Sequence, residues 1–84
     1  MSKRITIKSF DLDYAFLKYR LAHPEVSEKI ALGAHVIYQD TSDPEFNRVN
    51  EKLIREPLRR GKKCYRIIKN GRRWLVKPVK TKIE

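Results

Sequence analysis

Residues 61–79 read GKKCYRIIKNGRRWLVKPV, and this stretch decides the architecture of the C-terminal half of the chain. Two runs rich in β-branched and aromatic residues flank the pair Asn70-Gly71. An Asn-Gly pair favours a type I′ turn, in which both central residues have positive φ, and it is the strongest short-range signal for a β-hairpin. We therefore predict that strand 63–69 pairs antiparallel with strand 72–79.

A turn centred on Asn70 and Gly71 sets the register of this hairpin, with Ile67 facing Trp74 and Cys64 facing Lys77. Because side chains alternate along a strand and facing residues share a side, the hairpin has two unlike faces. One face carries Tyr65, Ile67, Trp74 and Val76, and the other carries Cys64, Arg66, Ile68, Arg73, Leu75 and Lys77. The first face is apolar, so Tyr65 and Trp74 are expected to pack under helices rather than to stack on bases.

Length and composition indicate one small domain over residues 1–84, with residues 1–3 and 80–84 frayed. The single cysteine, Cys64, excludes an intrachain disulfide and fits a reducing, cytoplasmic compartment. No apolar run approaches the length of a membrane span, so no membrane partner is expected. His23, His35 and Cys64 are too far apart in sequence for a zinc signature, and we expect neither metal nor cofactor.

The N-terminal part is predicted to be mostly helical. Residues 4–8 alternate in polarity and are interpreted as a short edge strand or an unstructured tail. Residues 11–23 are predicted as a helix whose apolar face is formed by Leu12, Ala15, Phe16, Tyr19 and Ala22. Pro24 interrupts it, so a short second helix is expected over residues 24–30. Residues 34–38 form a short apolar run that is typical of a buried strand.

A third helix is predicted over residues 44–60. Asp43 is its expected N-cap with Pro44 in the first turn, although Ser42 and Glu45 can instead form a capping box. Pro57 lacks an amide hydrogen and crowds the carbonyl of residue 53, so a kink or an end is expected near Glu56. Gly61 suits a left-handed cap.

These elements predict an α/β (α+β two-layer) fold. Strand 34–38, helix 44–60 and strand 63–69 form a βαβ unit, whose right-handed crossover makes the two strands parallel. Strand 72–79 then adds antiparallel on the outside, where Pro78 fits an edge strand. The result is N-terminal helices on a small mixed sheet of three strands, or of four if residues 4–8 add an edge.

The order of motifs resembles a family of small uncharacterised prokaryotic proteins, a domain of unknown function. The resemblance covers residues 11–68 and rests on a helix, His23-Pro24-Glu25, a short helix, Gly33-Ala34, an apolar strand, the DPEFN run at 43–47, a helix, Gly61 and a second apolar strand. It implies a cytoplasmic α/β domain without an assigned activity or functional residue. The basic C-terminal hairpin is where this chain is expected to depart from that family.

The charge of the chain is unevenly distributed. Residues 1–54 carry 8 Lys/Arg and 8 Asp/Glu, whereas residues 55–84 carry 12 and 2, so the net charge of +10 lies in the C-terminal part. This asymmetry favours a polyanionic partner, with DNA or RNA bound through backbone phosphates as the first hypothesis. The candidate nucleic-acid-binding residues are Arg59, Arg60, Lys62, Lys63, Arg66, Lys69, Arg72, Arg73 and Lys77.

Other functions are weighed against this one. The alternative is a protein-interaction module, either a homodimer built by pairing of sheet edges or a binder of an acidic protein. The loop 40–45 follows the first strand of the βαβ unit, where Mg²⁺ or a ribose could bind, but helix capping explains its residues better. An enzyme that uses this loop is the third hypothesis. His23 and His35 each stand alone, with no nucleophile near in sequence, so we expect no enzyme and no catalytic residue.

Overall fold

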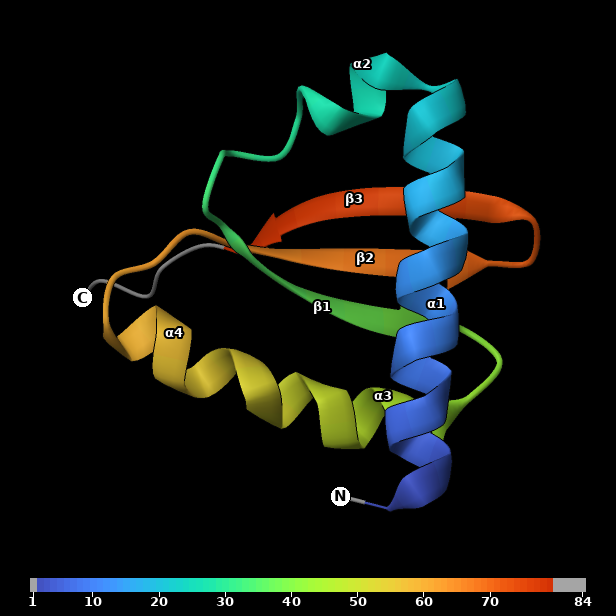
Figure 1. The fold of residues 1–84 in the computed structure, drawn as a ribbon. Helices are drawn as coiled ribbons and strands as arrows, with labels where there is room; N and C mark the ends of the chain where they lie inside the picture. Colours follow the sequence, from blue (N-terminus) through green and yellow to red (C-terminus); the bar gives the residue numbers. More distant parts are fainter. Residues whose placement is uncertain (1, 80–84) are drawn as a thin grey trace.

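The computed structural model describes residues 2–79 and shows a three-stranded mixed sheet with helices packed on it (Figure 1). In chain order the elements are α1 (Lys3–Ala22), α2 (Pro24–Ser27), β1 (His35–Asp40), α3 (Pro44–Glu51), the 3-10 turn η1 (Lys52–Ile54), α4 (Arg55–Arg59), β2 (Cys64–Asn70) and β3 (Arg73–Val79). The sheet order is β1-β2-β3, with β1 and β2 parallel and β2 and β3 antiparallel. The predicted α+β class and mixed sheet are confirmed; the frayed residues predicted at 80–84, and residue 1, lie outside the described residues.

Helix α1 is longer than predicted, because residues 4–8 belong to it rather than to an edge strand or a tail. Ser2 is its N-cap, and the Ser2 hydroxyl accepts a hydrogen bond from the Ile5 amide at 3.2 Å, so the helix begins at Lys3, inside the range 1–3 predicted to be frayed. Ile5, Leu12 and Phe16 form one buried line. Lys8 lies on that same side and interrupts the apolar repeat, which is why the sequence pattern hid the first two turns.

The segment after α1 largely follows the prediction. Helix α2 ends at Ser27 instead of residue 30, and β1 is longer than expected. Asp43 caps α3 with Pro44 in the first turn, as predicted: the Asp43 carboxylate accepts a hydrogen bond from the Phe46 amide at 3.2 Å.

Pro57 divides the predicted helix 44–60. Without an amide hydrogen at this position the regular ladder breaks one turn earlier, and η1 separates α3 from α4. Gly61 has φ +77° and closes α4, with its amide bonded to the Leu58 carbonyl at 3.0 Å and the Lys62 amide bonded to the Pro57 carbonyl at 3.0 Å. These two bonds are those of a Schellman cap, so the predicted role of Gly61 is confirmed.

The hairpin register differs from the prediction by two residues. Asn70 pairs with Arg73, so the central turn residues are Gly71 and Arg72, and Ile67 faces Val76 instead of Trp74. Gly71 has φ +64°, and within residues 2–79 only glycines have positive φ, which gives the sign pattern of a type II′ turn rather than type I′. Because the difference is an even number, every side chain keeps its predicted face.

The two faces of the sheet carry separate clusters. On the first face Tyr38, Ile67 and Trp74 meet α1, and the ring centroids of Phe16 and Trp74 lie 5.1 Å apart. Figure 1 shows α1 lying across the strands, with α3, η1 and α4 along the β1 side of the sheet. On the second face Ile54 of η1 packs with Ile37 and Cys64.

The second face is therefore covered beside β1 and open along β3. Arg73, Leu75 and Lys77 on β3 are all exposed there. The helices thus cover the Tyr65/Trp74 side, as expected, and additionally one margin of the basic side.

We predict that Trp74→Ala lowers the free energy of unfolding by about 3 kcal/mol, because it opens a cavity against Phe16 and Tyr19. Leu75→Ala is the matched control on the same strand, since Leu75 is exposed on the other face and its loss should cost about 0.5 kcal/mol or less. Urea unfolding followed by circular dichroism measures both. Equal midpoints for the two variants would contradict the packing of Trp74 in the core.

Candidate functional site

Most of the predicted basic residues lie in three parts of the structure, of which α4 and the hairpin turn stand at opposite ends of β2 (Figure 1). Arg59 ends α4, Lys62 and Lys63 follow it, Arg72 lies in the hairpin turn, and the second face of the sheet holds Arg66, Arg73 and Lys77. We name this set, with Arg60, the basic surface. The set runs from α4 and the loop after it to the second face of the sheet and the hairpin turn.

Arg66, one of the predicted nucleic-acid-binding residues, is partly buried and already paired. Its Nε donates to Glu51 of α3 at 3.1 Å and a terminal nitrogen donates to the second Glu51 oxygen. The hydrogen bond from Arg66 lowers the pKa of Glu51, although partial burial opposes the shift. Arg66 also faces Lys77 across the sheet, so Glu51 relieves the repulsion between two cations.

Arg59 and Arg60 share one counter-ion. Glu56 accepts a hydrogen bond from Arg59 at 2.9 Å and lies 3.8 Å from the Arg60 Nε. All three side chains are well exposed, so these pairs hold the arginines only weakly. Both guanidinium groups can exchange Glu56 for another anion.

The remaining members of the basic surface are exposed and make no ion pair with another described residue; they are Lys62, Lys63, Arg72, Arg73 and Lys77. Arg73 and Lys77 share the second face of β3 at a separation of four residues, which is about 13 Å along a strand. Leu75 lies between them and is 38% exposed. Two charges at this spacing suit an extended polyanion better than a small ligand.

Lys69 does not belong to the basic surface. Lys69 faces Trp74 and so lies on the first face of the sheet, where it lines an open hollow of about 450 Å³ with Arg4, Lys8 and Asp40. The alternation of β2 already separates Lys69 from Arg66, and only its proximity in sequence placed it in the predicted set.

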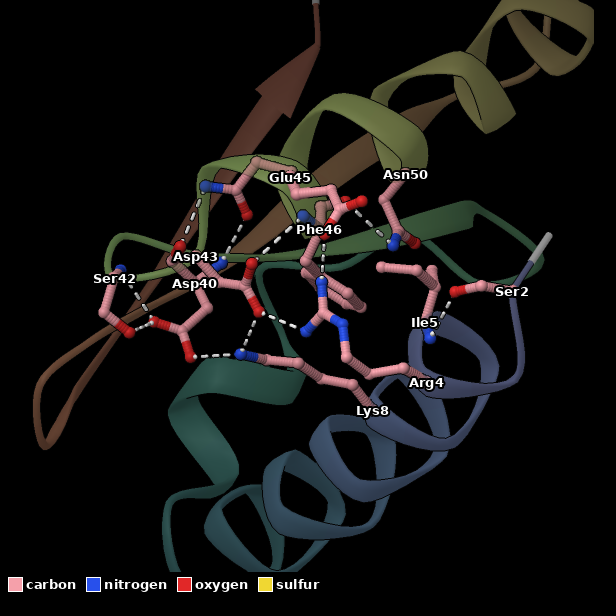
Figure 2. Close-up of polar contacts among 11 residues, drawn as sticks. Ser2, Arg4, Ile5, Lys8, Asp40, Ser42, Asp43, Glu45, Phe46 and Asn50 are labelled. Atoms are coloured by element: carbon pink, nitrogen blue, oxygen red, sulfur yellow. Dashed lines mark hydrogen bonds and ion pairs between the residues drawn. The ribbon is translucent and has the colours of Figure 1, made fainter.

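The loop between β1 and α3 is an ion-pair cluster (Figure 2). One oxygen of Asp43 caps α3, and the other accepts from Arg4 at 2.9 Å and from Lys8 at 2.8 Å. Asp40 accepts from the Ser42 amide at 2.9 Å and from its hydroxyl at 2.7 Å, and its second oxygen lies 3.1 Å from the Lys8 ammonium. Glu45 pairs with Arg4 at 2.8 Å.

This cluster has a structural role. The Asp40 and Asp43 carboxylates point at basic side chains and at loop amides, so they are already neutralised. In the described part of the chain no three His, Cys, Asp or Glu residues gather in a way that could hold a metal ion. The capping interpretation of the loop agrees with this geometry. The sequence analysis did not predict the ion pairs with Arg4 and Lys8. The signal that could have revealed them is a lysine, Lys8, within the apolar line of α1.

The cluster predicts a pH dependence of stability. Hydrogen bonds from Arg4, from Lys8 and from the Phe46 amide hold the pKa of Asp43 well below its usual range. Because the folded pKa lies below that of the unfolded chain, the stabilisation is complete at neutral pH and is lost as the pH falls below about 4.

Asp43→Asn should therefore lower the melting temperature at pH 7, because it keeps a capping oxygen but loses the ion pairs. At about pH 2 the difference from the wild type should shrink, because Asp43 of the unfolded chain is protonated there and folding must remove that proton. Thermal melts at the two pH values test this. A constant difference between the proteins at both would assign the effect to the cap alone.

Cys64, Tyr65 and Trp74, which the sequence analysis considered for a function, have structural roles in this fold. Cys64 is buried, and burial raises the pKa of its thiol, which disfavours a nucleophilic thiolate. The Tyr65 hydroxyl accepts a hydrogen bond from the Ala31 amide at 3.2 Å, and Trp74 packs on α1. Neither aromatic ring presents a free stacking platform, as the sequence predicted.

The fold and the charge pattern define a small α+β domain with exposed cations on the second face of its sheet. No helix within residues 2–79 has both the length and the hydropathy of a membrane span. The chain belongs to the family of unknown function DUF5647, whose model matches residues 4–81. The predicted family of unknown function is thereby confirmed, and the match extends beyond residues 11–68 to include the hairpin, where a departure was expected. No curated protein and no solved structure matches the chain.

Proposed function

We propose that this protein binds nucleic acid, DNA or RNA, through backbone phosphates that contact the basic surface. The observation that carries the proposal is the set of exposed cations without ion-pair partners in residues 2–79, namely Lys62, Lys63, Arg72, Arg73 and Lys77. Cations of this kind release condensed counterions when they meet a phosphate backbone, which gives affinity without base contacts.

The distribution of acids supports the same conclusion. Glu51 and Glu56, the acids nearest in sequence to the basic surface, already pair with its arginines. Tyr65 and Trp74 pack on the first face and so supply no base-stacking platform beside these cations. Binding with weak sequence selectivity follows, and the buried, unreactive Cys64 suits action in a reducing cytoplasm of a prokaryotic cell.

Arg73→Gln with Lys77→Gln should weaken binding to all sequences alike and reduce the slope of log K against log salt by about two. Both side chains are exposed, so the fold should persist. Fluorescence anisotropy with labelled single-stranded RNA, single-stranded DNA and duplex DNA at two salt concentrations measures the effect. Arg66 is left intact because its loss would leave the Glu51 carboxylate without its ion-pair partner.

The matched control is Lys3→Gln with Lys29→Gln, which removes the same charge from α1 and from the turn after α2. Its binding should fall by much less than that of the β3 variant, because these lysines do not belong to the basic surface. Wild-type protein that fails to bind any of the three probes at low salt overturns the proposal, as does an equal loss in both variants. Either result would make the basic surface a docking site for an acidic protein or a solubilising face.

A further inference from the structure

The side of α1 that faces away from the sheet carries a second apolar line. Its members are Ile7, Phe10, Tyr14, Leu17 and Leu21, and they are 51%, 69%, 63%, 49% and 76% exposed. We name them the α1 stripe. They recur at intervals of three and four residues, which is the spacing of the seam between two packed helices.

The stripe is distinct from the core-facing line of Ile5, Leu12 and Phe16, so α1 is apolar on two sides. Contiguous exposed apolar side chains of this size mark interaction surfaces on otherwise soluble domains. Next to the stripe, Phe10 and the 43% exposed Leu53 line a hollow of about 230 Å³ between α1 and β1. The apolar surface therefore continues from α1 onto η1.

We propose that a second copy of this chain covers the α1 stripe, with the two α1 helices antiparallel. A two-fold pairing that sets Tyr14 against Leu17 of the second copy also sets Phe10 against its Leu21. The same pairing brings Asp11 opposite Lys18 of the other copy, twice by symmetry. The charges that flank the stripe are thus self-complementary.

Asp11 and Lys18 are available for this role. Both are exposed, and neither makes an ion pair with another residue in the part of the chain that the structure describes; Lys18 only lies over the Tyr14 ring, 5.1 Å from its centroid. A parallel pair would rely on Asp13 and Lys18 instead. Asp13 accepts the Tyr38 hydroxyl of its own chain, which favours the antiparallel arrangement.

The size of the stripe fits a modest dimer. With about 200 Å² for each large side chain, the exposed fractions leave about 600 Å² of apolar surface per copy. A specific interface of ordinary size buries about 800 Å² per partner. Leu53 and the charged residues beside the stripe would add to the buried area and bring it close to this value. Pairing through the β1 edge is less suitable, because the Asn47 side chain already binds the Asp40 amide at 2.7 Å and its carbonyl at 2.8 Å.

Sedimentation equilibrium without nucleic acid tests the dimer independently of the proposed function. The wild type should dimerise with little dependence on salt, and Leu17→Glu should weaken the dimer at least tenfold, by about 1.4 kcal/mol. Leu75→Glu is the matched control, an exposed leucine on the opposite side of the sheet that should leave the dimer unchanged. Circular dichroism verifies that each variant is folded.

Charge exchange tests the orientation. Asp11→Lys or Lys18→Glu alone should weaken the dimer, because each places like charges opposite one another, and the double variant should restore it. A wild type that stays monomeric at every concentration overturns the proposal, as does a dimer that Leu17→Glu and Leu75→Glu affect equally. Single variants that are not rescued in the double variant overturn the antiparallel pairing.

Discussion

The ammonium group of Lys8 is the constraint on which the arrangement of the N-terminal half depends. It lies on the core-facing side of α1, and a partly buried charge is costly unless opposite charges surround it. Asp40 at the end of β1 and Asp43 at the start of α3 provide them (Figure 2). Three elements are thereby fixed to one point, and α1 is held where Ile5, Leu12 and Phe16 meet the sheet.

The same pairing shapes the charge distribution. Asp40, Asp43 and Glu45 are matched by Arg4 and Lys8, and Glu51 is matched by Arg66. Glu51 and Glu56, the acids nearest in sequence to the basic surface, are paired with its arginines, whereas Lys62, Lys63, Arg72, Arg73 and Lys77 have no ion-pair partner among residues 2–79. Exposed cations without a counter-ion suit an external polyanion.

The two proposed interaction surfaces lie on opposite sides of the domain. The α1 stripe faces away from the first face of the sheet, and the basic surface follows the second face. A dimer formed through α1 would leave both basic surfaces open. Two such surfaces on one particle would increase the effective affinity for a long nucleic acid that reaches both.

Local chemistry in the sequence determined much of the fold. Alternation assigned the hairpin faces, Asp43 and Pro44 marked the start of α3, Pro57 predicted its break, and Gly61 predicted a cap, because each of these depends on nearby residues alone.

Only the tertiary structure decided the rest. In the sequence Lys8 interrupts the apolar repeat of α1. In the structure two aspartates more than thirty residues away neutralise its charge, so it can lie on the core-facing side. Arg66 is a candidate phosphate-binding residue in the sequence, and only the packing of α3 shows that Glu51 already pairs with it. The hairpin turn moved by one residue, and the strand register by two, because pairing along whole strands outweighs the preference of one dipeptide. Helix α1 is apolar on two sides, and which side is buried depends on the sheet that packs against it, which no local pattern contains.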